Sequence, residues 1–201
     1  MARRLVYGIG INDANYVTQK KITLDGKQVE VWACPFYKKW QGMLRRCYDL
    51  REHAKHPSYA GCSVCEEWLS FSAFKSWMET QDWQGKHLDK DILIHGNKLY
   101  SPSTCVFVSE QVNKFLTEQK RNAGSLPLGV SLVADTKKYR AQCCNLHGVR
   151  IHLGCYSTPA EAHQAWLRKK HELACQLAAE QSDRRIAAAL STRFQPIKEC
   201  A

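Results

Sequence analysis

The sequence predicts an α+β protein made of two small domains, and three observations lead to this prediction. Stretches with apolar residues at helical spacing are mixed with short stretches in which apolar and polar residues alternate, so both helices and strands are expected. The 201 residues are 44% hydrophobic, which is enough to bury a sizeable core. A polar stretch, residues 117–127, separates two such mixed regions and is predicted to be a linker.

Residues 1–116 are predicted to form the first domain, which begins with an arm and two helices. Apolar-polar alternation on both sides of the pair Asp25-Gly26 indicates a hairpin or extended arm. From Pro35 onward the apolar residues lie on one face of a helix, and aromatic residues at helical spacing indicate a second one. The predicted core faces of the two helices consist of Trp40, Met43, Leu44, Cys47 and Tyr48, and of Trp68, Phe71, Phe74, Trp77 and Met78.

The first domain is predicted to end in two short strands and a helix. The strands are expected at His87 to Leu93 and at Cys105 to Val108, with a turn at Gly96-Asn97 between them. The helix is expected to begin after Ser109, because a serine side chain at that position can cap the first free backbone N–H groups.

Residues 128–181 are predicted to form a three-stranded antiparallel sheet backed by a helix. The strands are expected at about 128–133, 137–144 and 149–156. The helix start is indicated by Thr158-Pro159-Ala160-Glu161, which combines a capping box with proline at the first helical position. Residues 182–201 are predicted to be a short terminal helix and tail, starting at Ser182-Asp183.

The charge of the chain, +10 at pH 7, is unevenly distributed. Residues 114–171 carry ten Lys and Arg against three Asp and Glu, whereas residues 61–113 carry four against seven. Such basic regions attract polyanions, and nucleic acid is favoured over a membrane surface because they coincide with predicted strands. The start of the sequence has no apolar segment typical of a secretion signal, and no apolar run is long enough to span a membrane. A cytoplasmic location is expected.

The strand-strand-helix segment resembles the ββα-metal core of phage-encoded HNH homing endonucleases. The resemblance covers the stretch from Leu88 to Val108 and Asn113, and it extends to the upstream segment 59–77. In that family an Asp on the first strand and a residue on the helix hold Mg²⁺, a His beside the Asp is the general base, and an Asn before the second strand orients this base. The resemblance therefore implies an N-terminal HNH-like domain with Mg²⁺-dependent DNA nicking or cleavage.

Two of the four family positions are matched. Asp89 falls on the metal-binding Asp and Asn113 on the helix ligand, while Lys90 falls on the base His and Thr104 on the central Asn. Asp89, Lys90, Asp91 and Thr104 are the candidate catalytic residues, and Asp89 and Asn113 are the candidate metal ligands.

The two departures leave alternatives open. A lysine acts as a base only if its pKa is lowered by several units, and the neighbouring Asp89 and Asp91 oppose this. His87 or His95 could replace the base, or Asp91 could hold the metal together with Asp89. The competing interpretation is a degenerate core that only grips DNA.

The pair Cys62-x-x-Cys65 raises the question of a zinc site, with Cys47, His53 and His56 upstream. A structural zinc site needs four ligands, usually from two such pairs, and only one pair has this spacing. Zinc is not expected, and buried reduced thiols are the preferred interpretation.

Residues 128–171 resemble the Apetala-type DNA-binding domain that is appended to phage HNH proteins. The matching residues are Gly129-Val130, Tyr139-Arg140-Ala141, His152-Leu153-Gly154, Tyr156, Glu161-Ala162 and Ala165-Trp166. The resemblance implies a three-stranded sheet that binds the major groove of duplex DNA.

Alternation along the strands predicts which residues face the helix and which face outward. The face towards the helix is predicted to hold Tyr139, Ala141, Cys143, Ile151 and Leu153. The outward, DNA-binding face is predicted to hold Lys138, Arg140, Gln142, Arg150 and His152. Arg pairs well with guanine and Gln with adenine. An ordinary solvated sheet face is the alternative, and Ser131 and Val133 stand where the family often has arginines.

These observations predict a site-specific protein that binds double-stranded DNA, in the host bacterial cytoplasm if it is encoded by a phage. Mg²⁺-dependent cleavage is the activity that the resemblance implies, with a non-cleaving transcription or replication regulator as the alternative. RNA binding is disfavoured because no aromatic platform for single strands is evident. A monomer is expected, and no protein partner is indicated.

Overall fold

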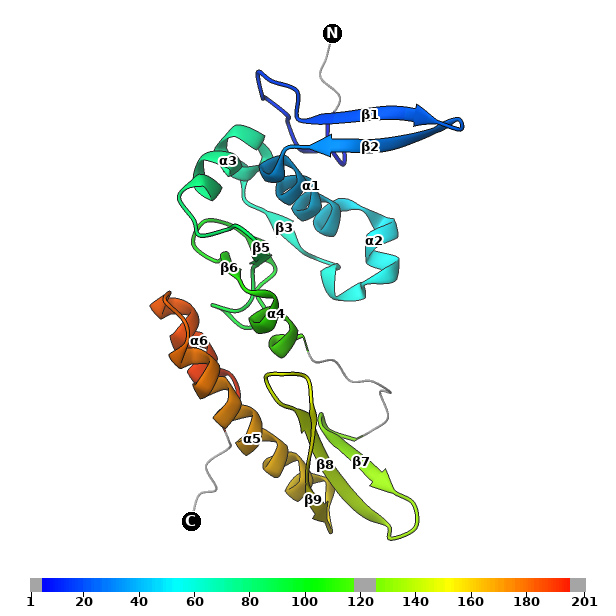
Figure 1. Ribbon diagram of the computed structural model, residues 1–201, viewed down its shortest axis with the longest axis vertical. Coiled ribbons are helices and arrows are strands. Elements are labelled where there is room, and N and C mark those ends of the chain that lie inside the picture. The colour runs from blue at the N-terminus through cyan, green and yellow to red at the C-terminus, as the bar shows by residue number, and fades with distance from the viewer. Residues whose placement is uncertain (1–4, 118–125, 196–201) are drawn as a thin grey trace. The chain divides into compact units, whose positions relative to one another are not determined.

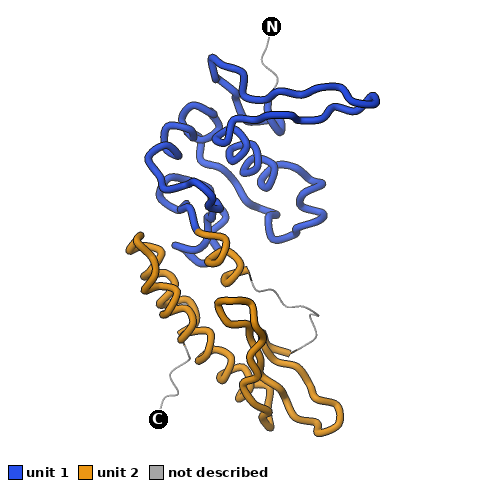
Figure 2. Tube along the Cα trace, in the orientation of Figure 1, with its two compact units in different colours: residues 1–108 blue, residues 109–201 orange. Residues whose placement is uncertain are grey.

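The computed structural model describes residues 5–117 and 126–195, which form a mixed α+β protein with several small sheets, as predicted (Figure 1). The chain divides into two compact units, Met1–Val108 and Ser109–Ala201 (Figure 2). This division lies before helix α4 (Glu110–Leu116), whereas the sequence prediction placed it after residue 116. Residues 118–125 of the predicted linker lie outside the described residues.

The predicted hairpin is present in the first unit. Strands β1 (Gln19–Leu24) and β2 (Lys27–Ala33) pair antiparallel and are joined by Asp25 and Gly26. Both turn residues have positive φ, 49° and 73°, as a two-residue turn that follows the twist of the strands requires. The segment before the hairpin packs on the helices, since Ile11 forms a parallel bridge with Ser70.

Helices supply most of the core of the first unit. Helix α1 (Pro35–Tyr48) and helix α3 (Phe71–Glu79) bury the apolar faces predicted for them, including Trp40 and Phe74. The indole of Trp40 donates a hydrogen bond of 2.7 Å to the carbonyl of Trp68. Trp68 belongs to a short 3-10 turn, η2 (Glu66–Leu69), and α3 begins after it. Helix α2 (Leu50–Lys55) and the turn η1 (Pro57–Tyr59) were not predicted.

Two pairs of short strands follow the helical core along the chain. Strands β4 (His87–Asp89) and β6 (Val106–Val108) pair antiparallel, with Asp89 opposite Val106. Strands β3 (Ser63–Val64) and β5 (Leu99–Tyr100) pair parallel and were not predicted. Strand β4 is shorter than the predicted strand because the carboxylate of Asp89 accepts hydrogen bonds from the next backbone N–H groups and turns the chain.

The second unit contains the predicted sheet and helix. Strands β7 (Val130–Val133), β8 (Lys138–Cys144) and β9 (Arg150–Tyr156) form an antiparallel sheet in the order β7-β8-β9 (Figure 1). Helix α5 (Pro159–Ala179) starts with a complete capping box between Thr158 and Glu161. Helix α6 (Arg184–Arg193) starts at the predicted place, with Asp183 as its N-cap.

Helix α4 is held in the second unit by an aromatic cluster around a buried lysine. Only 1% of Lys170 is exposed, and its ammonium lies 3.6 Å from the ring centroid of Phe115 on α4. The ring centroid of Phe194 lies 5.1 Å from the same ammonium, which also donates to the carbonyl of Phe115. A desolvated cation over aromatic faces is strongly attracted to them, so Lys170 fastens α4 to α5 and to the end of α6.

Candidate nucleic-acid interface

One face of the sheet in the second unit packs against α5. Residues that the sequence predicted to face the helix lie on this side. Ala141 and Cys143 on β8 are buried, and Tyr139 and Leu153 pack against the small core formed by Ala141, Ala162 and Ala165. The predicted alternation along β8 is therefore confirmed. The small alanines let the helix approach the sheet closely.

The opposite face of the sheet carries the five predicted DNA-binding residues. Lys138, Arg140, Arg150 and His152 are exposed, and Gln142 is half-buried. Register brings Gln142 opposite His152, so these two polar side chains lie on adjacent strands. We call this surface, formed by Lys138, Arg140, Gln142, Arg150 and His152, the outer sheet face.

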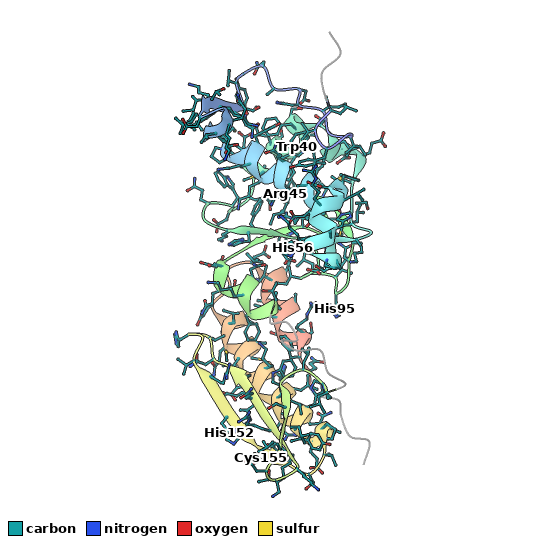
Figure 3. The ribbon with its side chains drawn as sticks, turned by 90° about the vertical axis from the view of Figure 1, so that its right-hand side faces the viewer. Trp40, Arg45, His56, His95, His152 and Cys155 are labelled. Carbon is teal, nitrogen blue, oxygen red and sulfur yellow. The ribbon has the colours of Figure 1, made fainter. Side chains whose placement is uncertain are left out.

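A bulge in β9 sets the remaining residues of the outer sheet face. The register shifts between Ala141 and Gln142, and Gly154 adopts a φ of +123° there. As a result Arg140 lies between Ser131 on β7 and Cys155 on β9, and its guanidinium Nε donates to the hydroxyl of Ser131 at 3.4 Å. Figure 3 labels His152 and Cys155 on this strand. The sequence prediction did not include Cys155, because plain alternation from His152 skips it.

The outer sheet face is basic and lacks acidic side chains. The three strands contain Lys138, Arg140 and Arg150 but no Asp or Glu. None of these three cations forms an ion pair within residues 5–117 and 126–195. Because no carboxylate of the sheet neutralises them, they are available to an anionic ligand such as a nucleic-acid backbone.

The nuclease-like centre in the first unit begins with Asp89 at the end of β4. Its Oδ1 accepts hydrogen bonds from the backbone N–H groups of Asp91, at 2.9 Å, and Ile92, at 2.7 Å. Burial raises the pKa of Asp89, and the negative charge of Asp91 raises it further, while the two backbone hydrogen bonds oppose this. One oxygen of this carboxylate is thus engaged in a local turn.

Lys90, at the position of the family's base, points back into the protein. Its side chain is 8% exposed, and its ammonium lies 3.4 Å from Oδ2 of Asp91 and 5.9 Å from the ring centroid of Tyr100. The ammonium of Lys90 is therefore held by a carboxylate inside the protein. The same ion pair supplies Asp91 with a positive charge from within the protein.

Thr104, at the position of the central Asn, has a structural role in the turn before β6. Its hydroxyl donates to the carbonyl of Leu99 at 2.8 Å and lies 2.9 Å from the hydroxyl of Ser101. The side chains of Asp89, Lys90 and Thr104 therefore all have partners within the first unit. His87 and His95, the alternative bases, are both exposed at the protein surface.

The metal ligands implied by the resemblance lie in different units. Asp89 belongs to the first unit, and Asn113 lies half-buried on α4 in the second. Among residues 5–117 and 126–195, no three His, Cys, Asp or Glu side chains are grouped so that they could hold a metal ion. Of the two described carboxylates, Asp89 accepts backbone N–H groups with one oxygen, and Asp91 pairs with Lys90.

The cysteines singled out for zinc belong to the core of the first unit. Cys47 and Cys62 are buried there, and Cys65 packs against the same cluster. Burial raises the pKa of the Cys47 thiol to about 12 and also raises that of Cys65. Both thiols are therefore protonated at neutral pH, whereas metal binding and nucleophilic attack require a thiolate.

Comparison with known proteins gives no relatives: no protein-family model, no curated protein and no solved structure matches the chain. Within the described residues, none of the helices is both long enough and apolar enough to cross a bilayer.

Proposed function

We propose that this chain binds double-stranded DNA through the outer sheet face and that its HNH-like first unit grips DNA without cleaving it. The observation that carries the proposal is the separation of side chains on the sheet. Apolar residues lie against α5, while Lys138, Arg140, Gln142, Arg150 and His152 lie together on the other side. A sheet of this width fits the major groove, where arginine and glutamine side chains reach base edges.

The charge of the outer sheet face supports a nucleic acid over a neutral ligand. The positive side chains have no acidic partner within the sheet, so they would neutralise phosphates and release the counterions that surround DNA. Gln142 and His152 lie between Arg140 and Arg150 along β8 and β9 and offer hydrogen bonds that distinguish base pairs.

Lys90 favours the non-cleaving interpretation over the Mg²⁺-dependent endonuclease. Its ammonium already pairs with Asp91, and Asp89 is engaged by backbone N–H groups. A hard cation such as Mg²⁺ would compete with these internal partners, and no described histidine stands at the position of the base. The proposed role is that of a regulator that acts on DNA in the cytoplasm.

The deciding experiment measures duplex binding and nicking in the same samples. The full chain is incubated with labelled fragments of genomic DNA at several salt concentrations, with Mg²⁺, Mn²⁺ or EDTA. We expect retained fragments to lose affinity by orders of magnitude between about 50 and 200 mM salt and to remain intact with either cation. Binding that does not change with salt would argue against DNA as the ligand.

A matched pair of variants tests which surface binds. Arg140→Ala should weaken duplex binding, whereas Lys114→Ala, on the exposed side of α4 and paired with Glu110, serves as the control because it removes one positive charge outside the outer sheet face. Nicking by the wild-type protein with Mg²⁺ that disappears in Asp89→Ala would replace the regulator with the endonuclease.

A further inference from the structure

Arg46, on the first unit's helix α1, is a charged side chain that is held in place but has no acidic partner among the described residues. Its guanidinium Cζ lies 5.5 Å from the ring centroid of Tyr100 and 5.9 Å from that of Tyr59. Its Nε donates a hydrogen bond of 3.0 Å to the hydroxyl of Tyr100. Tyr100 is buried, so this bond fixes the guanidinium on a rigid support.

Two carboxylates on nearby segments, Glu52 and Asp91, already form ion pairs with other basic residues. Glu52 pairs with Arg45 at 3.3 Å, and Asp91 pairs with Lys90 at 3.4 Å. Within residues 5–117 and 126–195, Arg46 itself forms no ion pair. A half-buried guanidinium without a counter-charge is costly, and a bound anion would remove this cost.

The two Nη groups of Arg46 are not engaged by the described part of the protein. Tyr100 takes up Nε, and neither Nη atom has a hydrogen-bond partner among the described residues. Every fully buried side-chain nitrogen or oxygen in that part of the chain does have a partner, so both Nη atoms must reach solvent. The two Nη groups form a fork with the geometry that matches two oxygens of a phosphate.

We propose that Arg46, oriented by Tyr100 and Tyr59, is a phosphate-binding site, and that its ligand is a phosphodiester of the nucleic-acid backbone. The ammonium of Lys90 lies 5.9 Å from the Tyr100 ring, but it is paired with Asp91, so the positive charge of this site comes from Arg46. Because the guanidinium is fixed before the ligand arrives, little side-chain entropy is lost on binding. That the bound phosphate belongs to a nucleic-acid backbone rests on the proposed function. That Arg46 binds phosphate does not.

The first test uses inorganic phosphate and does not depend on DNA binding. The melting temperature of the full chain is compared in sodium phosphate and in sodium chloride of equal ionic strength. Phosphate ions stabilise folded proteins in general, so we expect the melting temperature to rise by the same amount for the wild type and for Arg45→Gln, and to rise clearly less for Arg46→Gln. Arg45 is the matched control, because it is adjacent, half-exposed and paired with Glu52. Equal stabilisation of Arg46→Gln by phosphate would overturn the site.

The second test identifies the source of the phosphate. Losing one bidentate contact should weaken duplex binding by Arg46→Gln about tenfold and lower the slope of log affinity against log salt by about one. An unchanged duplex affinity, with the phosphate effect still reduced, would assign the site to a free phosphate compound and overturn the backbone assignment. A phosphate effect that depends on Arg46, in a wild-type protein that fails to bind duplex, would refute the proposed function and leave the site intact.

A milder variant protects both tests against a folding defect. If Arg46→Gln melts well below the wild type, Tyr100→Phe keeps the aromatic ring and removes only the hydroxyl that holds Nε. We expect this variant to retain a phosphate effect that is weaker than that of the wild type. A phosphate effect of full size in Tyr100→Phe would contradict the orienting role of Tyr100.

Discussion

Replacing Gly129 by alanine should destabilise the second unit far more than replacing Gly148. Both glycines have positive φ, 76° and 79°, so an alanine at either position adopts a strained backbone at a cost of about 1–2 kcal/mol. The difference lies in the space around them. A Cβ on Gly148 would meet nothing within 4 Å, whereas a Cβ on Gly129 would lie 1.9 Å from Cδ1 of Trp166.

Trp166 cannot easily move away from such a Cβ. Only 3% of it is exposed, and its ring stacks on His163 with centroids 5.4 Å apart and meets Phe194 edge to face. The clash is with the part of the indole near its attachment, so rotation of the ring does not relieve it. Overpacking of this kind adds about 1–3 kcal/mol, which brings the total for Gly129→Ala to about 2–5 kcal/mol.

The assay is thermal unfolding of the full chain, with hydrogen exchange of peptides from α5 to identify the transition of the second unit. One kcal/mol corresponds to about 4–8 °C for a unit of this size, so Gly129→Ala should melt at least about 4 °C below Gly148→Ala. In a Trp166→Ala background the difference between the two variants should largely vanish, because the clashing atoms are gone. Equal melting temperatures in the wild-type background would refute the packing argument.

Three further changes test other parts of the molecule. Arg140→Ala should cost about 1–3 kcal/mol of duplex binding and relax the preference at one base pair in a selection experiment; equal weakening for all sequences would show that Arg140 contacts only phosphate. Lys170→Met should keep the fold but release α4, seen as faster hydrogen exchange around Phe115, and unchanged exchange would contradict its role. Asp13→Asn should lower the stability by about 1 kcal/mol, because Asp13 accepts from the first turn of α3 at Ser72.

The Asp13 variant also makes a prediction about pH. Burial raises the pKa of Asp13, but the hydrogen bonds from Ser70 and Ser72 outweigh it and hold the pKa below its ordinary value. A carboxylate with a depressed pKa in the folded state stabilises the fold above its unfolded pKa, about 3.9, and loses this effect as the pH falls through the folded pKa. The stability difference between wild type and Asp13→Asn should therefore be constant near neutral pH and shrink below about pH 4, and a difference that persists in acid would contradict the ionised cap.

Local rules were sufficient for the sheet and for helix α5 of the second unit because their signals lie next to each other along the chain. The capping box at Thr158 and Glu161 is completed by residues three positions apart, and the strand limits follow from alternation and turns. The hairpin at Asp25 and Gly26 was predictable for the same reason. Short-range interactions decide these elements in the folded protein.

Elements that depend on distant partners were not predictable. The parallel pair β3 and β5 brings Ser63 to Leu99, and neither two-residue strand carries a periodic pattern. The sequence prediction placed α4 before the domain boundary, and the residue that holds it in the second unit, Lys170, is separated from Phe115 by 55 positions along the chain. A lysine on a helix is normally exposed to solvent. The residues next to Lys170 along the chain do not indicate that its ammonium lies near the rings of Phe115, Trp166 and Phe194.

The candidate centre of the first unit shows a different limit of the sequence. The resemblance placed Asp89 and Lys90 at functional positions, but their present roles depend on where the chain turns next. Two backbone N–H groups take up one oxygen of Asp89, and the ammonium of Lys90 folds back onto Asp91. The sequence left open both a metal centre and a degenerate core, and these two possibilities differ in where the side chains of Asp89 and Lys90 point.

The bulge at Gly154 explains how one strand can serve both the core and the outer sheet face. Strict alternation from His152 would direct Tyr156 outward and leave its ring in solvent. The extra residue shifts the pattern by one, so Tyr156 packs against the core under α5 and donates to the carbonyl of Leu153, while Cys155 takes the outward position beside Arg140. A side chain at residue 154 would need the left-handed φ of +123° that glycine tolerates. The glycine therefore determines which neighbours Arg140 has on the proposed DNA-binding surface.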